Sequence, residues 1–195
     1  MKRLVPLLLI VMLALALGWE LTRGPERPAP PAAPTGGDFT LQSAKGPLSL
    51  ASLRGKAVLL YFGYTSCPDV CPTTLTDIGQ ALRQLAPAEL KRVQGIFVSV
   101  DPKRDTLKHL ATYTTYFHPD IVGVTGTQAE VTRVAHAYGA AFHIGKPDKN
   151  GDYSVEHTSD IYLIDPKGRL VRVLHHGVKP AAIVAALRKV LGGPG

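Results

Sequence analysis

Both cysteines of this 195-residue chain lie in one short segment, where three residues separate Cys67 from Cys71. Thiolates are soft ligands that select metals such as Cu(I) and Zn²⁺, and two neighbouring thiols can also exchange with a disulfide. A disulfide between residues only four apart constrains little of the unfolded chain, so a stabilising role explains this pair poorly. The spacing therefore indicates metal binding or dithiol redox chemistry.

The cysteine segment stands between a predicted buried strand and a predicted helix. The apolar run 57–62 predicts the strand, and apolar residues recur at helical spacing from Leu75 onward. The partly positive N-terminus of the helix should favour the thiolate form of the cysteines. If the residues between them are helical, the two side chains share one face with Cβ atoms roughly 6 Å apart. One soft ion could then bridge both sulfurs.

A nitrogen ligand would allow such a site to accept Cu(II) as well as Cu(I). Among the seven histidines, His157 is favoured because it precedes the predicted strand 161–164, in the loop that thioredoxin-like domains place against their cysteine motif. A surface or structural role is expected for the others. Zinc is the rival ion, but its structural sites use four protein ligands, and the chain offers no third cysteine. We therefore predict a copper site formed by Cys67, Cys71 and His157.

A redox-active pair, Cys67 and Cys71, is the open alternative. Thioredoxin-like oxidoreductases usually have two residues between their cysteines, whereas this chain has three. Peroxide reduction is disfavoured because Leu60 and Tyr64 occupy the positions where a peroxiredoxin has proline and threonine before its reactive cysteine.

Two acidic positions give weaker signals. The segment 148–152 alternates oxygen ligands like a calcium loop, but Ser159 stands where the closing glutamate is required, so a solvated turn is predicted. Asp101 ends a predicted strand, where it either orients a ligand from the outer shell or is simply a turn residue before Pro102.

The remaining pattern is that of an α/β protein. The predicted strands are a hairpin at 39–50 and single strands at 57–62, 95–100, 121–125, 161–164 and 170–174. Helices are expected after the cysteines, after a cap at Asp105 or Thr106, after a capping box at Thr127 and Glu130, and from Pro180. This order predicts a thioredoxin-like fold, a mixed central sheet with helices on both faces. Ligands of such sheets gather beyond the carboxyl ends of the strands.

The N-terminus predicts export. Lys2 and Arg3 precede the apolar run 4–17, which either is cleaved or stays as a single membrane anchor, and we expect the anchor. Proline-rich residues follow and should form an extended spacer. The expected organisation is a signal or membrane anchor at 1–23, a linker at 24–37 and a copper-binding domain at 38–195. The domain should lie on the extracytoplasmic side of a bacterial cytoplasmic membrane.

The net charge of +7 is spread along the chain, and no basic run exceeds two residues. Nucleic-acid binding has little support, because neither a basic stripe nor interleaved aromatic residues accompany the charge. Mild attraction to an acidic partner or to an anionic lipid surface is the simpler expectation.

Four segments together resemble the SCO/SenC family, thioredoxin-like copper proteins that assist cytochrome c oxidase assembly. They are LRGKAVLLYFGYTSCPDVCPTTL (53–75), VSVDPKRDT (98–106), VGVTGT (122–127) and VEHTSDIYLIDPKG (155–168). By this resemblance Cys67 and Cys71 match the copper cysteines and His157 the copper histidine. The departures, Leu107 after the RDT motif and Glu156 before the histidine, touch no ligand.

The resemblance implies a metallochaperone that delivers copper to the binuclear site of cytochrome c oxidase subunit II. It also leaves open a thiol-disulfide reductase that keeps the cysteines of that site reduced, or a redox or copper-signalling protein. The implied partners are subunit II, other copper chaperones or thioredoxin-like reductants, and the membrane. A chaperone needs His157 and is no enzyme, whereas a reductase needs only the dithiol.

Overall fold

A computed structural model describes residue 12 and residues 34–192 of the chain. The predicted anchor at 1–23 and most of the linker at 24–37 lie outside these residues, so the boundaries of the three segments stay predictions. Within the described part of the chain, no helix is both long and apolar enough to cross a bilayer.

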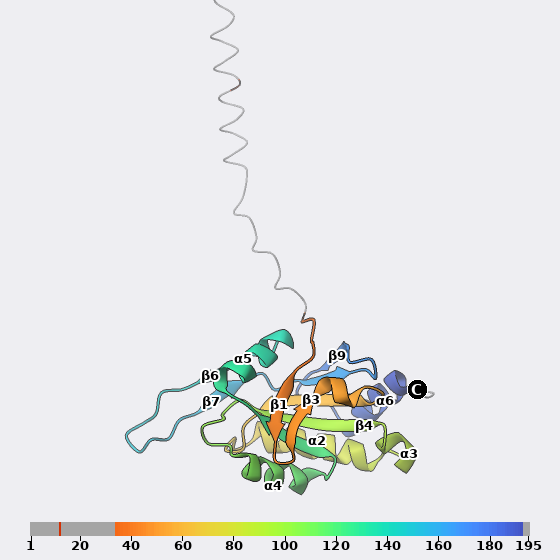
Figure 1. Cartoon of the computed structure of the whole chain (residues 1–195), viewed down its shortest axis with the longest axis horizontal. Coiled ribbons are helices and arrows are strands. Elements are labelled where there is room, and N and C mark those ends of the chain that lie inside the picture. The colour runs from red at the N-terminus through yellow and green to blue at the C-terminus, as the bar shows by residue number, and fades with distance from the viewer. Residues whose placement is uncertain (1–11, 13–33, 193–195) are drawn as a thin grey trace, which may run out of the picture. The chain divides into compact units, whose positions relative to one another are not determined.

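A mixed sheet of seven strands in the order β2-β1-β5-β4-β3-β8-β9 forms the centre of the domain (Figure 1). Its strands are β1 (Thr40–Ser43), β2 (Gly46–Ser49), β3 (Ala57–Gly63), β4 (Val93–Ser99), β5 (Ile121–Thr125), β8 (Ile161–Ile164) and β9 (Leu170–Leu174). Strands β3, β4 and β5 are parallel, whereas β1 and β8 run antiparallel to their neighbours. The mixed sheet is the one that the sequence predicts.

Helices cover both faces of this sheet (Figure 1). The main helices are α2 (Val70–Arg83), α4 (Leu107–Phe117), α5 (Gln128–Ala137) and α6 (Pro180–Leu191). Helix α2 packs against α4 and α6 on one face, and α5 lies on the other. Two short helices were not predicted, η1 (Leu50–Leu53) and α3 (Pro87–Leu90).

The helix ends follow the predicted caps. The Thr106 side chain accepts from the His109 backbone N–H and begins α4, so Asp105 is not the cap. The capping box of Thr127 and Glu130 begins α5. Gly192, with a φ of 78°, ends α6 in the left-handed conformation that glycine adopts without strain.

The core is built around β3, in which every residue is buried. Tyr61 packs against Phe97 on the face covered by α2 and α4, and the next residue, Phe62, packs against Tyr138 on the α5 face. Such alternation is what a strand covered on both faces requires. The described core residues all lie between Phe39 and Leu187, so the domain has a hydrophobic core of its own.

A second, two-stranded sheet lies beside the main one. Strands β6 (Phe142–Ile144) and β7 (Val155–His157) pair antiparallel and are joined by a polar loop. The carboxylate of Asp148 accepts from the backbone N–H groups of Asn150 and Asp152, which makes this loop a side-chain-bonded turn. The turn agrees with the sequence prediction, but the strands themselves were missed.

Candidate metal centre

The two cysteines lie where β3 gives way to α2. Helix α2 begins at Val70, so Cys67 stands before it in a turn, and the backbone N–H of Cys67 donates to the carbonyl of Tyr64 at 3.3 Å. Cys71 is the second residue of the helix. The residues between the cysteines are not all helical, so the condition for both side chains to share one helical face is not met, and a turn presents the first sulfur. Both thiols are free, and Cys71 is fully buried.

His157 is the last residue of β7, and its ring reaches the cysteines. Its Nε2 atom lies 3.2 Å from the Cys71 sulfur, and the ligand atoms of Cys67, Cys71 and His157 all lie within 4.8 Å of one another. Within the described residues, this is the one cluster of three or more potential metal ligands. The structure thus brings together the three predicted side chains, and their binding of a metal stays a prediction.

The backbone holds the imidazole in the orientation that a ligand needs. Its Nδ1 atom lies 3.0 Å from the carbonyl oxygen of Thr158, so that nitrogen carries the proton and donates it. The lone pair of Nε2 is therefore directed to the sulfurs. The rings of Tyr61 and Tyr64 meet the imidazole edge-on, with centroids 6.2 and 5.9 Å away. A second group that fixes tautomer and ring orientation is usual for metal-binding histidines.

The geometry fits one small, soft ion. Bonds of roughly 2.0–2.3 Å to nitrogen and sulfur place three ligand atoms about 3.5–4 Å apart. The three ligand atoms here lie within 4.8 Å of one another, which is close to that spacing. Cys67 and His157 also line an open depression of about 390 Å³, together with Tyr64 and Val155. Two sulfurs and one nitrogen suit copper, whereas a structural zinc site takes a fourth protein ligand.

Burial opposes ionisation at this site. It raises the pKa of the Cys71 thiol to about 12, although backbone hydrogen bonding at Tyr64 works in the other direction. It also lowers the pKa of His157, because the charged imidazolium is poorly solvated there. Burial therefore works against the thiolate form that is expected for a cysteine at the start of a helix. A metal ion would have to displace the thiol proton.

Gly63, the last residue of β3, makes room for the Cys71 sulfur. A Cβ atom at this position would lie 2.7 Å from that sulfur and 2.7 Å from Cε2 of Phe97. Gly63 was not among the site residues predicted from the sequence. The signal was present, because a glycine at the end of a buried strand often marks a close approach.

Two phenol groups lie beside the cysteines without hydrogen bonds. The hydroxyls of Tyr61 and Tyr113 are buried and have no partner among the described residues. Burial raises the pKa of both, and the nearby Cys71 raises them further. Both rings therefore stay neutral at physiological pH. Unsatisfied buried hydroxyls are rare, and these two lower the stability of the fold next to the thiols.

Asp105 fixes the loop that carries the first cysteine. Its buried carboxylate accepts from the backbone N–H of Thr65 at 3.0 Å and from the Thr65 hydroxyl at 2.5 Å. The hydroxyl of Ser99, at the end of β4, donates to the same carboxylate at 2.5 Å. Asp105 therefore ties the cysteine loop to the neighbouring strand.

Asp101 supports the site indirectly. It accepts from Arg104 and, at 2.9 Å, from the hydroxyl of Tyr153, and it is not part of the ligand cluster. The Arg104 guanidinium lies over the rings of Tyr153 at 3.8 Å and Tyr64 at 5.6 Å. Since Tyr64 contacts the imidazole of His157, this stack links the polar loop after β6 to the metal centre.

His175 and His176 follow β9 at the same edge of the sheet. His175 lies 3.3 Å from the carboxylate of Asp160, and Nδ1 of His176 lies 3.4 Å from the Thr74 hydroxyl. Both histidines lie in the turn that follows β9, beyond the predicted strand 170–174. Neither belongs to the ligand cluster.

Together, the fold and the site define a class of proteins: thioredoxin-like α/β domains that present two thiols and an imidazole at the carboxyl end of a central strand. The model of the SCO1/SenC family matches residues 27–192, and the chain belongs to this family. The resemblance found in the sequence is thereby confirmed.

Several relatives make the likeness concrete. The mitochondrial SCO2 homolog of Bos taurus is 42% identical over 134 residues, which are 68% of this chain and 50% of that protein. The structure of Bradyrhizobium japonicum ScoI with copper bound has a TM-score of 0.73 and 39% identity, covering 80% of this chain and 99% of that one. BsSco is described as having a disulfide switch and as a member of the Sco family of cytochrome c oxidase assembly proteins. Its structure has a TM-score of 0.64 and 25% identity, and the match covers 85% of this chain and 98% of BsSco. The chain spans about half the length of the Bos taurus relative.

Proposed function

We propose that this chain is a metallochaperone that binds one copper ion through Cys67, Cys71 and His157 and delivers it to the binuclear copper site of cytochrome c oxidase subunit II. The observation that carries the proposal is the convergence of three ligand atoms within 4.8 Å, with the His157 lone pair facing the sulfurs. The copper-bound structure of the related ScoI supports the choice of metal.

The uneven exposure of the ligands suits transfer. Cys71 is fully buried, whereas Cys67 and His157 line the open depression. Incoming ligands of a recipient would approach from that side and replace Cys67 and His157 first. Three ligands leave room for such exchange, which a closed site with four protein ligands would resist.

The proposed setting is the cytoplasmic membrane of a bacterium. The apolar run 4–17 would serve as a single anchor, and the proline-rich linker at 24–37 would hold the domain on the extracytoplasmic side. Copper would be received there from another chaperone, and thioredoxin-like reductants would keep the thiols reduced.

A thiol-disulfide reductase acting on the cysteines of subunit II is the second candidate. It is favoured by two free thiols whose sulfurs lie within 4.8 Å of each other, and by the disulfide switch described for BsSco. In this function Cys67, the more exposed thiol, would attack the target disulfide, and Cys71 would resolve the mixed disulfide. A redox or copper-signalling role is the third candidate, and it predicts normal oxidase activity without this chain.

His157→Ala separates chaperone from reductase, and His143→Ala is the matched control. His143 lies on the paired strand β6, opposite Glu156, and its side chain is exposed. We expect His157→Ala to lower Cu(I) and Cu(II) affinity by more than tenfold, because loss of even an outer-shell partner costs about that much. Anaerobic copper titration of residues 38–195 measures it, and the control should bind like the wild type.

The same variants are then expressed as full-length chains in cells that lack the wild-type protein. The chaperone proposal expects His157→Ala to abolish oxidase maturation while thiol exchange with a model disulfide is retained. Maturation that survives without His157 but is lost in Cys67→Ser would support the reductase instead. Normal oxidase activity in cells without the chain would leave only the signalling role.

A further inference from the structure

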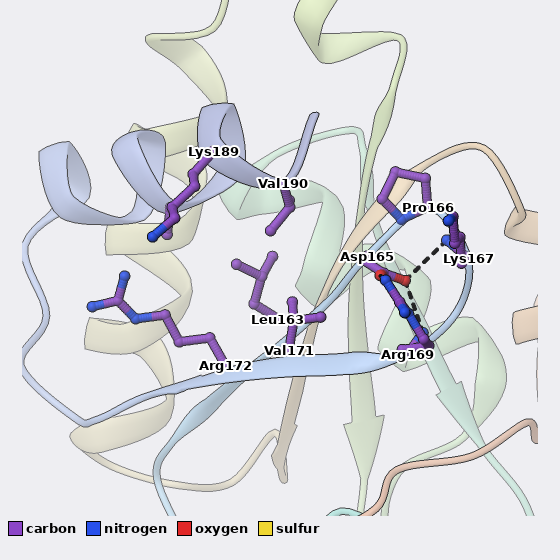
Figure 2. A pocket seen from close by; sticks show the side chains of 10 residues that line it. Leu163, Asp165, Pro166, Lys167, Arg169, Val171, Arg172, Lys189 and Val190 are labelled. Atoms are coloured by element: carbon purple, nitrogen blue, oxygen red, sulfur yellow. Dashed lines mark hydrogen bonds and ion pairs between the residues drawn. The ribbon is translucent and has the colours of Figure 1, made fainter. Parts of the chain in front are cut away.

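A basic pocket lies between the outer strand β9 and helix α6, with a volume of about 460 Å³ (Figure 2). Four cationic side chains surround it, and all four are exposed: Lys167, Arg169, Arg172 and Lys189. None of them has a role in the copper site. These cations form no long basic run in the sequence, because they come from the segment 167–172 and from Lys189, which is distant from it along the chain.

Most of this charge is not neutralised. Asp165, the one acidic residue that lines the pocket, is paired with Arg169 at 2.6 Å and also accepts from the backbone of Lys167. Among the described residues, Lys167, Arg172 and Lys189 have no carboxylate within ion-pair distance. Three exposed positive charges with no acidic partner favour an anionic ligand.

The floor of the pocket is apolar. Leu163, Ala186 and Val190 contribute to it, and Val171 points into it from β9 with 44% of its surface exposed (Figure 2). An inorganic anion would gain nothing from such a floor. A phospholipid has both a negative headgroup and an adjoining apolar part, so it matches the cations and the floor at once.

The location of the pocket agrees with a membrane surface. Strand β8 runs antiparallel to β3, so the turn at 165–168 lies at the end of the sheet opposite the cysteines. The first described residues of the domain lie at this end too, because a Cβ on Gly36 would be 2.9 Å from Cβ of Leu170, the first residue of β9. The chain therefore enters the domain at this end of β9, where Gly36 lies against Leu170 and Tyr138 on the α5 face, and the pocket lies on the other face of the same strand.

We propose that this pocket docks the domain onto anionic phospholipid, with Lys167, Arg172 and Lys189 contacting headgroups and Val171 contacting the glycerol region. The proposal rests on the membrane tether proposed above. Docking at this end would turn the copper site away from the bilayer and leave it open to a recipient. An acidic protein is the less suitable occupant, since a copper recipient must reach the opposite end of the sheet.

Vesicle binding by metal-free residues 34–195 tests the proposal. This segment contains the complete described core. The match to the ScoI structure covers 99% of the ScoI chain, which therefore has a similar extent, so the segment should fold alone. The pocket variant is Lys167→Gln/Arg172→Gln/Lys189→Gln. The control is Lys45→Gln/Lys108→Gln/Arg133→Gln, which removes the same charge from exposed positions elsewhere.

Binding is measured by co-sedimentation with phosphatidylcholine vesicles that contain 0 or 30% phosphatidylglycerol. Each cation near an anionic bilayer contributes about a fivefold factor, so the pocket variant should lose on the order of 100-fold in partitioning. The control should lose far less, and salt should weaken wild-type binding. Circular dichroism and thermal unfolding establish that both variants fold.

Three results would overturn the proposal. One is no preference of the wild type for vesicles with phosphatidylglycerol. Another is an equal loss in the pocket and control variants, which would indicate attraction by net charge alone. The third is that the wild type binds a polyglutamate peptide or inorganic phosphate but not vesicles, and that the pocket variant loses this binding. Because no copper is present, these outcomes do not depend on whether the chaperone proposal holds.

Discussion

Replacing Gly63 by alanine tests whether the end of β3 is shaped for the Cys71 sulfur. The new Cβ would lie 2.7 Å from both the sulfur and Phe97 Cε2, about 1 Å closer than van der Waals contact allows. Overpacking of this kind costs about 1–3 kcal/mol. For a domain of this size the melting temperature should fall by roughly 2–12 °C.

The specific consequence concerns the metal. Cys71 stands in the first turn of α2, where it can relieve the clash by moving its sulfur away from His157. Such a misplaced ligand should lower copper affinity by roughly 10–100-fold, the effect typical of perturbed metal-site geometry. Competition with a Cu(I)-specific chelator under anaerobic conditions measures this affinity, and the thermal unfolding of the metal-free variant is measured in parallel.

Gly95→Ala is the matched control. Gly95 lies in the adjacent strand β4, and its added Cβ would meet Ile121 Cγ1 at 3.0 Å and no atom of the site. It should lower stability while leaving copper affinity within about twofold of the wild type. Equal copper affinity for wild type and Gly63→Ala, with both variants destabilised, would refute the idea that Gly63 serves the sulfur.

Three further predictions concern buried polar groups. Tyr61→Phe removes a hydroxyl that has no partner among the described residues, so the melting temperature should rise by roughly 2–4 °C; a fall would show that the hydroxyl is bonded after all. Asp105→Asn leaves one acceptor oxygen and no negative charge for the three donors at Thr65 and Ser99, so it should cost about 1–3 kcal/mol in urea unfolding. A loss under about 0.5 kcal/mol would contradict the role given to this carboxylate. Burial lowers the pKa of His118, and the nearby Asp120 partly opposes this shift. The unfolded chain therefore binds the proton more readily than the folded protein does, so the stability should fall as the pH drops below about 6.5. The urea midpoint at pH 7 and pH 5 should differ less for His118→Asn than for the wild type, and an equal difference would refute this assignment.

The main sheet and its helices follow from local patterns in the sequence. The run 57–62 is apolar without interruption, and a strand covered on both faces needs such a run. The capping box of Thr127 and Glu130, which are three residues apart, marks the start of α5. Gly192 marks the end of α6. Each signal lies within a few residues of the structure that it determines, which is why it can be read without tertiary information.

The meeting of the three ligands was predictable because it depends on topology. Parallel strands put the segment after β3 at one edge, and the residues before β8 return to that edge because β8 is antiparallel. The immediate surroundings were not predictable. The turn that presents Cys67 and the burial that raises the pKa of Cys71 both depend on packing between distant segments.

The missed elements share a physical cause. Strands β6 and β7 have three residues each, of which only Val155 is buried, so periodicity gives almost no signal for them. The basic pocket was missed because its cations are adjacent in space and scattered in sequence, at 167–172 and at Lys189. Contacts of this kind can be found only when the whole fold is known.

Because His157 lies on the minor β6–β7 sheet, apart from the elements that carry the cysteines, a bound ion would link two separate parts of the domain. An ion bound by Cys71 and His157 would be a reversible cross-link between two residues that are distant in the chain. Closing such a long loop restricts the unfolded chain. Release of the ion would remove this cross-link and make the β6–β7 hairpin less rigid. The empty and the loaded protein would then differ in stiffness, which a recipient or a reloading partner could sense.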